Sequence, residues 1–324
     1  MTAAAMTPTT TAPGRSSSRH LLALRGLPAK DLRSLLASAR DAAATPPMVP
    51  GGLTIATLFF EDSTRTRTSF TLAAQRCGLH CVDLSAVTSS VNKGETLIDT
   101  ALTVEAMGVQ ALIVRARQSG AAALIAQRVR IPVLNAGDGR HEHPTQGLLD
   151  AMTVAKAFDR LDTFDFRGVH VAIVGDIISS RVARSAIAAF TTLGARVTCV
   201  GPASMAPASL ASLGVEVSPR LDAVVDQADA VMMLRIQFER HASGEPGKAP
   251  TLASVREYRA FYALTTERAA RMKDHAIVLH PGPMNRGIEI DAEVADAARS
   301  RVLAQVANGV PVRMAALAWC LGRV

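Results

Sequence analysis

Short apolar runs alternate with amphipathic segments along most of the chain. Apolar runs of this length predict buried strands. They lie at 53–60, 80–84, 111–114, 132–135, 169–176, 195–200, 215–217, 230–234 and 276–279. Apolar residues recur at helical spacing at 20–43, 63–78, 95–107, 121–128, from 143 onward, and at 181–192, 204–212, 220–227, 292–308 and 311–321. Strands that alternate with helices in this way predict parallel, doubly wound α/β sheets.

Length and composition favour a folded chain with two α/β units. Its 324 residues suit two domains, and 48% hydrophobic against 19% charged residues supply a full core. We place the boundary between the units near 145–165, ahead of the apolar run 169–176. Residues 1–18 are mostly Ala, Thr, Ser and Pro, and we expect them to form a disordered tail.

The formal net charge of +7 raises the question of nucleic-acid binding. However, the chain has no basic block, and aromatic residues, which stack on bases, make up only 4% of it. The arginines are scattered along the chain, and several lie in motif-like places. We therefore expect a site for small anionic substrates and no nucleic-acid partner.

The cysteines, Cys77, Cys81, Cys199 and Cys320, are too few for a disulfide framework. Cys77 and Cys81 lack a second close pair or a nearby histidine cluster, so the sequence predicts buried thiols and no metal site. No apolar run reaches the ~18–20 residues that span a bilayer, and residues 1–18 do not make a secretory signal. We therefore expect a cytoplasmic protein without a membrane partner.

The turn after the first predicted strand is rich in groups that bind anions. It reads Ser63-Thr64-Arg65-Thr66-Arg67 and leads directly into a helical pattern. A helix N-terminus offers free N–H groups and the positive end of the dipole, Ser and Thr are good N-caps, and Arg adds a planar fork. The turn therefore predicts a phosphate or carboxylate site. The alternative is an ordinary capped helix with solvated arginines.

Two further polar residues follow predicted strands. Arg115 closes the run 111–114, and His143 follows the strand 132–135 after a glycine turn. Because ligands bind at the carboxyl ends of parallel strands, both can converge with Ser63–Thr66 on one rim. The alternatives are a surface arginine at a strand end and a histidine satisfied in the core or at a helix cap.

Four spaced motifs carry a resemblance to a known family. They are the turn 63–67, Lys93-Gly94-Glu95, His143-Pro144-Thr145-Gln146 and His280-Pro281-Gly282-Pro283. In this order, on this α/β pattern, the chain resembles the aspartate/ornithine carbamoyltransferase family from about residue 20 onward. The resemblance implies two doubly wound parallel-sheet domains. The carbamoyl phosphate-binding domain is expected at 19–146, with a returning helix at about 305–324 packed on it, and the aspartate-binding domain at 147–304.

The resemblance implies transfer of the carbamoyl group of carbamoyl phosphate to the amine of L-aspartate, without a cofactor, in pyrimidine biosynthesis. The implied carbamoyl phosphate site contains Ser63, Thr64, Arg65, Thr66, Arg115, His143, Gln146, Pro281 and Gly282. Within it, Arg65 binds the phosphate and Arg115 is a second cation on the phosphate and the carbonyl. Thr66, Arg115 and His143 together polarise the carbonyl, which is oxyanion-type stabilisation. Gln146 and the carbonyls of Pro281 and Gly282 face the amide or the incoming amine. The departing phosphate takes the amine proton, so His143 is not assigned as a general base.

The implied aspartate site must bind two carboxylates. Arg181, Arg235 and Gln237 match the family positions for this role, and arginine forks suit carboxylates. Lys93 also belongs to the implied aspartate site. Ser89 and Lys93 match a loop that reaches into a neighbouring subunit's site, which implies a homotrimer with shared sites. The alternative for Lys93 is a surface residue on a flexible loop.

Three other arginines lie near these positions. Arg184 and Arg240 read as solvated residues, although Arg240 and Glu61 also resemble an interdomain ion pair. The loop 240–250 is expected to be mobile. Many relatives carry His-Pro after the arginine that matches Arg115, whereas this chain has Ala116-Arg117, so Arg117 can share that role.

Other functions stay open at this point. Ornithine or another amine is the alternative acceptor, but two spare arginines fit a dicarboxylate better. A non-catalytic nucleotide-binding module is suggested by the run 171–176, which lacks G-x-G-x-x-G. Regulatory or dihydroorotase subunits are potential partners on which the sequence gives no sign.

Overall fold

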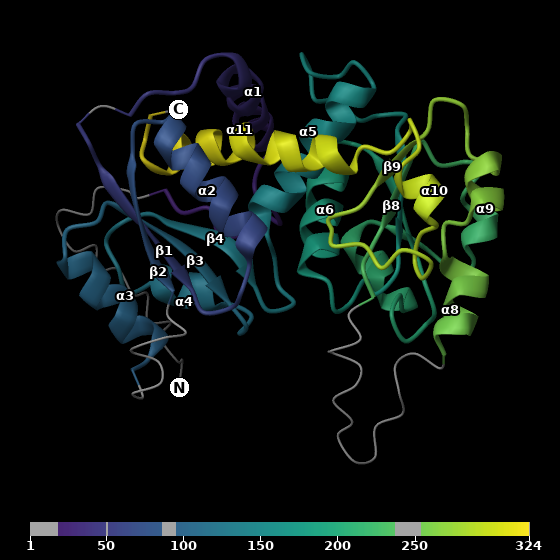
Figure 1. Cartoon of the computed structure of the whole chain (residues 1–324), viewed down its shortest axis with the longest axis horizontal. Helices are drawn as coiled ribbons and strands as arrows, with labels where there is room; N and C mark the ends of the chain where they lie inside the picture. Colours follow the sequence, from purple (N-terminus) through teal and green to yellow (C-terminus); the bar gives the residue numbers. More distant parts are fainter. Residues whose placement is uncertain (1–18, 50, 86–94, 237–253, 324) are drawn as a thin grey trace, which may run out of the picture.

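The computed structural model describes residues 19–49, 51–85, 95–236 and 254–323. In this part of the chain two parallel sheets lie side by side, with strand orders β2-β1-β3-β4 and β7-β6-β5-β8-β9 (Figure 1). The first sheet contains β1 (Thr54–Phe59), β2 (His80–Ser85), β3 (Ala111–Ala116) and β4 (Val133–Asp138). The second contains β5 (His170–Val174), β6 (Arg196–Val200), β7 (Glu216–Ser218), β8 (Ala230–Met233) and β9 (Ile277–Leu279). The predicted fold class of two doubly wound parallel sheets is confirmed.

Helices cover both faces of each sheet. On the first sheet these are α1 (Ala29–Ala44), α2 (Thr64–Arg76), α3 (Leu97–Ala106), α4 (Ala121–Ala126) and α5 (Pro144–Ala157). On the second they are α6 (Arg181–Thr192), α8 (Val255–Tyr262), α9 (Thr266–Arg271) and α10 (Ala292–Ala295), and α11 (Val302–Cys320) closes the chain. Strands buried on both faces need mainly apolar residues, which is why β3 reads as an apolar run up to Arg115 and β5 as an apolar run from Val171.

The core of the first sheet has two layers. Alternate residues of β1, such as Ile55 and Phe59, face α1, α2, α5 and α11, whereas Ala56 and Leu58 face α3 and α4. This alternation follows from the period of two in a strand. The first of these layers continues without interruption to β5 and α6 of the second sheet. The two sheets therefore share one apolar core along α5, α6 and α11.

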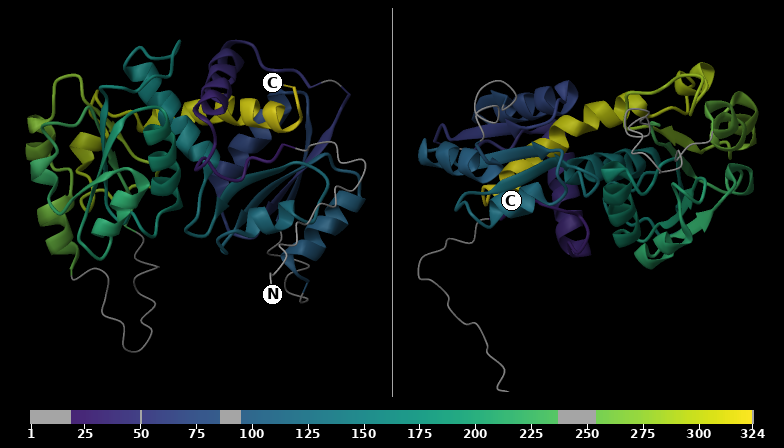
Figure 2. Two further views of the ribbon diagram at one scale, coloured as in Figure 1. Left: turned by 180° about the vertical axis from the view of Figure 1, so that it is seen from behind. Right: turned by 90° about the horizontal axis from the view of Figure 1, so that it is seen from below.

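The last helix returns to the first sheet, as the resemblance implies. Helix α11 crosses the molecule and packs against α1, α2 and α5 (Figures 1 and 2). Pro311 lies inside it, whereas the pattern predicts two helices that break there. An internal proline costs about 3 kcal/mol, but the buried face from Val312 to Cys320 stabilises the continuous helix.

Four other helix predictions are wrong or only partly right. Residues 20–27 form no helix, because Leu21 pairs in parallel with Leu134 at the edge of the first sheet. The segments 204–212 and 220–227 contain only 3₁₀ helices, at Ala208–Leu213 and Leu221–Ala223. The helix predicted at 292–308 is split between α10 and the start of α11. Tertiary pairing and short-range turns override periodicity in these places.

Several predictions fall outside the described residues. They concern the tail 1–18, Ser89, Lys93, Gln237, Arg240 and the loop 240–250. The domain boundaries at 146 and 305 stay predictions. Across the described ranges, no helix is long and apolar enough to cross a membrane.

Candidate active site

A cavity of about 910 Å³ lies where the carboxyl ends of the two sheets meet. Its walls come from the turn after β1, the ends of β3 and β4, the first turns of α2, α5 and α6, and the segments after β8 and β9. The predicted residues that line it are Ser63, Thr64, Arg65, Thr66, Arg115, His143, Gln146, Arg181, Arg235, Pro281 and Gly282. Topology therefore brings together residues that are far apart in the sequence, as expected for parallel strands.

The turn after β1 presents the N-terminus of α2 to the cavity. Ser63 occupies the N-cap position, but its side chain accepts no capping hydrogen bond, so its hydroxyl does not satisfy the first turn. The first N–H groups of a helix have no intrahelical acceptor and favour an anion. Arg65 lies beside them, and partial burial of its guanidinium, followed by the charge of Arg235, lowers its pKa. A guanidinium held near another cation is stabilised by any anion that binds there.

Arg115 is buried at the end of β3 and is held from two directions. Its Nη1 donates to the carbonyl oxygen of Ala136 at 3.1 Å, and its Nη2 donates to Glu61 Oε1 at 3.1 Å. Gly137 follows Ala136 with a φ of 115°, and a Cβ at this position would lie 3.0 Å from Arg115 Nη1 and 3.0 Å from Arg181 Nε. Glycine is thus required here by both backbone conformation and space.

Arg181 lies at the first position of α6, and its fork faces Glu61. Its Nη1 donates to Glu61 Oε2 at 3.0 Å, and its Nη2 donates to Glu61 Oε1 at 2.8 Å. Glu61 therefore joins Arg115 of the first sheet to Arg181 of the second. The predicted partner of Glu61, Arg240, lies outside the described residues.

His143 is buried at the N-cap of α5. Its backbone N–H donates to Ser185 Oγ at 2.9 Å, while its Nδ1 is buried and accepts no hydrogen bond from the described residues. Burial, and then the charges of Arg115, Arg313 and Arg181, hold the pKa of His143 well below its usual value. The imidazole is therefore neutral near pH 7 and can donate one hydrogen bond to a carbonyl oxygen.

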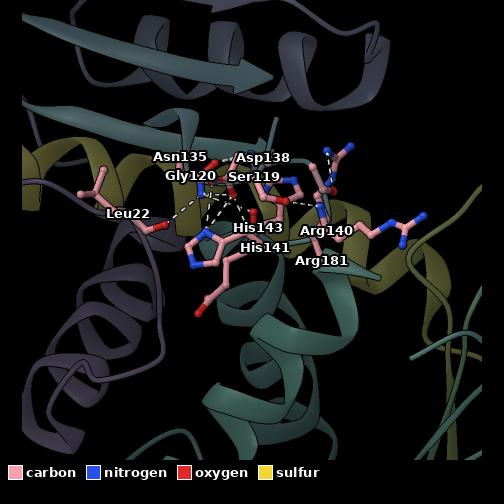
Figure 3. A network of polar contacts seen from close by, with 12 residues as sticks. Leu22, Ser119, Gly120, Asn135, Asp138, Arg140, His141, His143 and Arg181 are labelled. Carbon is pink, nitrogen blue, oxygen red and sulfur yellow. Dashed lines mark hydrogen bonds and ion pairs between the residues drawn. The ribbon is translucent and has the colours of Figure 1, made fainter. Parts of the chain in front are cut away.

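A polar network shapes the loop between β4 and α5 that carries His143 (Figure 3). The buried carboxylate of Asp138 accepts from the N–H of Gly120 at 2.7 Å, from Asn135 Nδ2 at 2.8 Å and from the N–H of Glu142 at 3.1 Å. Asn135 Nδ2 also donates to the carbonyl of Leu22 at 2.9 Å, which ties the chain ahead of α1 to this loop. Such a network rigidifies a buried loop when every member has a partner.

The loop after β9 forms another wall. The N–H of Gly282 donates to His280 Nδ1 at 2.8 Å, so the proton of this imidazole sits on Nε2, which faces Glu289 Oε1 at 3.2 Å. A Cβ at Gly282 would lie 3.3 Å from Arg65 Nη1, which shows how closely this loop approaches the first sheet's arginine. Pro281 and Gly282 line the cavity with Arg65.

The remaining arginines separate into two groups. Arg235 and Arg117 line the cavity, and Arg117 is exposed, whereas Arg184 is not part of the lining. Arg140 and the buried Arg313 also line it, and neither was among the predicted site residues. Burial, and then the charge of Arg115, lowers the pKa of Arg313 to about 10. A lone arginine within the apolar segment 312–320 is the signal that points to it.

Two sequence profiles of one family match nearly the whole described chain. The carbamoyl-phosphate binding domain of aspartate/ornithine carbamoyltransferases matches residues 19–156, and the Asp/Orn binding domain matches 167–320. The chain belongs to the aspartate/ornithine carbamoyltransferase family. The resemblance based on four motifs is thereby confirmed over both halves of this carbamoyltransferase.

Named relatives refine the comparison. The aspartate carbamoyltransferase catalytic subunit of Gluconacetobacter diazotrophicus is 48% identical over 305 residues, which cover 92% of each chain. That of Frankia casuarinae is 49% identical over 315 residues, 95% of this chain and 96% of the relative. Aspartate transcarbamoylase from Trypanosoma cruzi, solved with carbamoyl aspartate and phosphate, is 26% identical with a TM-score of 0.76 and covers 98% and 99% of the two chains. Ornithine carbamoyltransferase from Pyrococcus furiosus is 26% identical with a TM-score of 0.79 and covers 95% and 98%.

Proposed function

We propose that this carbamoyltransferase transfers the carbamoyl group of carbamoyl phosphate to the amine of L-aspartate. The products are N-carbamoyl-L-aspartate and phosphate, in pyrimidine (UMP) biosynthesis. The observation that carries this proposal is the presence, in one cavity, of the N-terminus of α2 with Arg65 and of Arg181 with Arg235. The first pair suits the dianionic phosphate, and the second suits a dicarboxylate. The catalytic subunits that are about 48% identical over most of the chain support aspartate as the acceptor.

The chemistry begins with binding of the donor. The N–H groups of the first turn of α2, the hydroxyls of Ser63 and Thr64 and the guanidinium of Arg65 hold the phosphate. Thr66, Arg115 and the neutral His143 surround the carbonyl oxygen and stabilise the negative charge that develops on it. Gln146 and the carbonyl oxygens of Pro281 and Gly282 face the carbamoyl amide.

The transfer step needs no general base from His143. The neutral amine of aspartate attacks the carbamoyl carbon, and a tetrahedral intermediate forms. The bond from that carbon to the phosphate oxygen then breaks, and the departing phosphate takes the proton of the former amine. The low pKa of His143 fits a mechanism in which phosphate, and not His143, takes the proton. A weakly basic imidazole can donate a hydrogen bond without accepting the proton of the amine.

The acceptor site uses Arg181, Arg235 and Gln237 for the two carboxylates of aspartate. In the described residues the fork of Arg181 is engaged by Glu61. Aspartate binding therefore involves sharing or exchange of this fork between two carboxylates. We further propose that residues 19–146 with 305–324 form the donor domain and that 147–304 form the acceptor domain.

We also propose that each active site is shared between two subunits. Ser89 and Lys93 from a neighbouring subunit complete each site, so the working unit is a cytoplasmic homotrimer. The test mixes two inactive chains, Lys93→Ala and Arg65→Ala, because a mixed trimer then contains some sites with both native residues. Partial recovery of activity is expected, and verified mixed trimers with no activity contradict shared sites.

The acceptor is tested by a competition assay with two amines. Product formation from carbamoyl phosphate is measured with L-aspartate and with L-ornithine at equal concentrations. We expect N-carbamoyl-L-aspartate as the main product. Faster formation of citrulline, the carbamoylated ornithine, would show that the roles of Arg181 and Arg235 are wrong, while leaving the donor half intact.

A further inference from the structure

A buried carboxylate lies behind the donor half of the cavity. Asp150, on the second turn of α5, is fully buried, and its Oδ1 accepts two hydrogen bonds. Gln146 Nε2 donates to it at 2.9 Å, and Gln305 Nε2, from α11, donates to it at 2.7 Å. Both glutamines line the cavity, whereas Asp150 does not.

These contacts assign the orientation of both glutamine amides. The carboxylate oxygen of Asp150 accepts hydrogen bonds, so each glutamine must turn its NH₂ group toward it. Each Oε1 therefore points away from Asp150. The Oε1 of Gln305 accepts from the N–H of His280 at 2.9 Å. The Oε1 of Gln146 is then left as an acceptor on the cavity side.

The same chain of hydrogen bonds crosses from one sheet to the other. It runs from His280, which follows β9, through Gln305 to Asp150 and ends at Gln146. His280 in turn accepts from the N–H of Gly282. Gln146 and the loop 280–283 form two walls of the donor pocket. Asp150 Oδ1 thus links the positions of these two walls.

We propose that Asp150 is a positioning residue that keeps the Gln146 oxygen toward the carbamoyl NH₂, and thereby selects a carbamoyl over an acetyl group on the phosphate. This inference rests on the proposed donor. Acetyl phosphate carries a methyl group where carbamoyl phosphate carries NH₂, so it leaves the Gln146 oxygen without a donor. A site built to hydrogen-bond a group rejects the analogue that lacks it.

Protonation of Asp150 does not disturb this arrangement. Burial raises the pKa of Asp150 to about 7. Both amides donate to Oδ1, while Oδ2 is buried without a hydrogen-bond partner among the described residues. A proton on Oδ2 leaves Oδ1 as an acceptor, so the neutral acid positions Gln146 as the anion does. Asparagine, which keeps one acceptor oxygen, is therefore the conservative replacement.

The test measures binding of three compounds to the full-length protein by calorimetry. These are carbamoyl phosphate, acetyl phosphate and inorganic phosphate. For Asp150→Ala we expect about tenfold weaker binding of carbamoyl phosphate, because two buried amides lose their acceptor. Binding of inorganic phosphate and acetyl phosphate should change by less than about twofold, because neither contacts the Gln146 oxygen through an N–H. Asp150→Asn should stay within about threefold of the wild type for all three.

Coupling between Asp150 and Gln146 supplies the second readout. In the Gln146→Ala background, Asp150→Ala should weaken the binding of carbamoyl phosphate by less than about twofold further, because the effects of two substitutions in one hydrogen-bond network are not additive. Asn308→Ala is the matched control. It removes the hydrogen bond from Asn308 Nδ2 to Thr153 Oγ1, at 2.9 Å, another link between α11 and α5 that lies outside the cavity lining, and should leave donor binding unchanged.

Two results overturn the role of Asp150. One is an equal loss of binding for carbamoyl phosphate and inorganic phosphate, and the other is a full effect of Asp150→Ala in the Gln146→Ala background. If Asp150→Ala does not fold, Asp150→Leu, which fills the space of the carboxylate without offering an acceptor, takes its place, and the same loss restricted to carbamoyl phosphate is expected. A wild-type protein that binds no carbamoyl phosphate overturns the proposed function together with this inference. If the wild type binds carbamoyl phosphate normally but the variants lose binding of all three compounds equally, the inference alone is overturned.

Discussion

The donor half and the acceptor half of the cavity are held in different ways. In the donor half, Arg115 divides its fork between the carbonyl of Ala136 and the carboxylate of Glu61, and the N–H of His143 donates to Ser185. In the acceptor half, Arg181 is oriented by the carboxylate of Glu61 from the other sheet. A guanidinium already paired with a carboxylate makes the contacts that a substrate carboxylate would make. Arg115 keeps one nitrogen on a backbone oxygen, whereas Arg181 gives both terminal nitrogens to Glu61, so the acceptor has to compete with or join Glu61.

The largest effect is expected from breaking the donor half at Arg65. Arg65→Ala removes the cation beside the α2 N-terminus and should lower kcat/KM for carbamoyl phosphate by roughly 10³-fold, the loss typical of one preorganised electrostatic contact. Steady-state kinetics and donor binding measure it. Arg67→Ala is the control, because Arg67 faces Asp83 at 3.5 Å and lies outside the cavity lining. Full activity of Arg65→Ala would contradict the phosphate-binding turn.

A smaller effect should follow from removing the charge that joins the halves. Glu61→Gln keeps the side-chain shape but leaves Arg115 and Arg181 without their shared anion, so their mutual repulsion disturbs both. We expect kcat/KM for aspartate to fall by about tenfold, in line with misplacement of substrate-positioning groups. Donor binding should change less.

The control for Glu61→Gln is Asp296→Asn. Asp296 forms an exposed two-point pair with Arg286, at 2.7 Å for each contact, and neither residue lines the cavity. Exposed pairs contribute about 0–1 kcal/mol, so neither activity nor stability should change appreciably. An aspartate kcat/KM for Glu61→Gln equal to the wild type would show that the two halves are not coupled through Glu61.

The link between α6 and the segment that carries His143 should have a milder effect. Ser185 Oγ accepts from the N–H of His143 at 2.9 Å and donates to Glu142 Oε2 at 2.8 Å. Ser185→Ala leaves two buried groups without this partner, which costs about 1–3 kcal/mol of unfolding free energy. Denaturant titration measures the loss, and Ser212→Ala, at an exposed 3₁₀ turn, is the control. An unchanged stability would show that the network around His143 is not rigid.

The smallest effect on activity is expected from Asp150→Asn. This variant should instead change how stability depends on pH. Burial raises the pKa of Asp150 from 3.8 to about 7 in the folded state, so between these values the folded protein binds the proton more tightly than the unfolded chain. Its contribution to stability is therefore present below pH 4 and is lost as pH rises through 7. Asp150→Asn, which cannot ionise, should gain stability relative to the wild type from pH 5 to pH 8. If the stabilities of the two proteins depended on pH in the same way, this would contradict a raised pKa of the buried Asp150 carboxyl.

The buried His143 acts in the opposite direction in the same profiles. Its folded pKa lies well below 6.5, so below pH 6.5 the unfolded chain binds the proton more tightly and stability falls as pH falls. The two proteins share His143, and its contribution cancels in their difference. The comparison of wild type with Asp150→Asn therefore isolates one carboxyl group.

Local sequence determined the strands, the turns and the donor side chains. An apolar run followed by Ser63-Thr64-Arg65-Thr66 folds as strand, turn and helix N-terminus because each step depends on neighbours in the chain. Parallel strands place their carboxyl ends together, so Arg115 and His143 were predictable partners of this turn. The same reasoning failed at residues 20–27, where pairing of Leu21 with Leu134 replaced the helix.

Tertiary structure alone decided how these side chains are partnered. Glu61 meets Arg181 across a separation of 120 residues, and Asp150 meets Gln305 across 155, because both contacts form only when α5, α6 and α11 pack on the shared core. Such pairings carry no periodic signal, since the residues belong to elements whose meeting depends on the fold as a whole. The sequence thus determined which groups the site contains, and the packing of the two sheets decided which of them face the substrates and which hold the others in place.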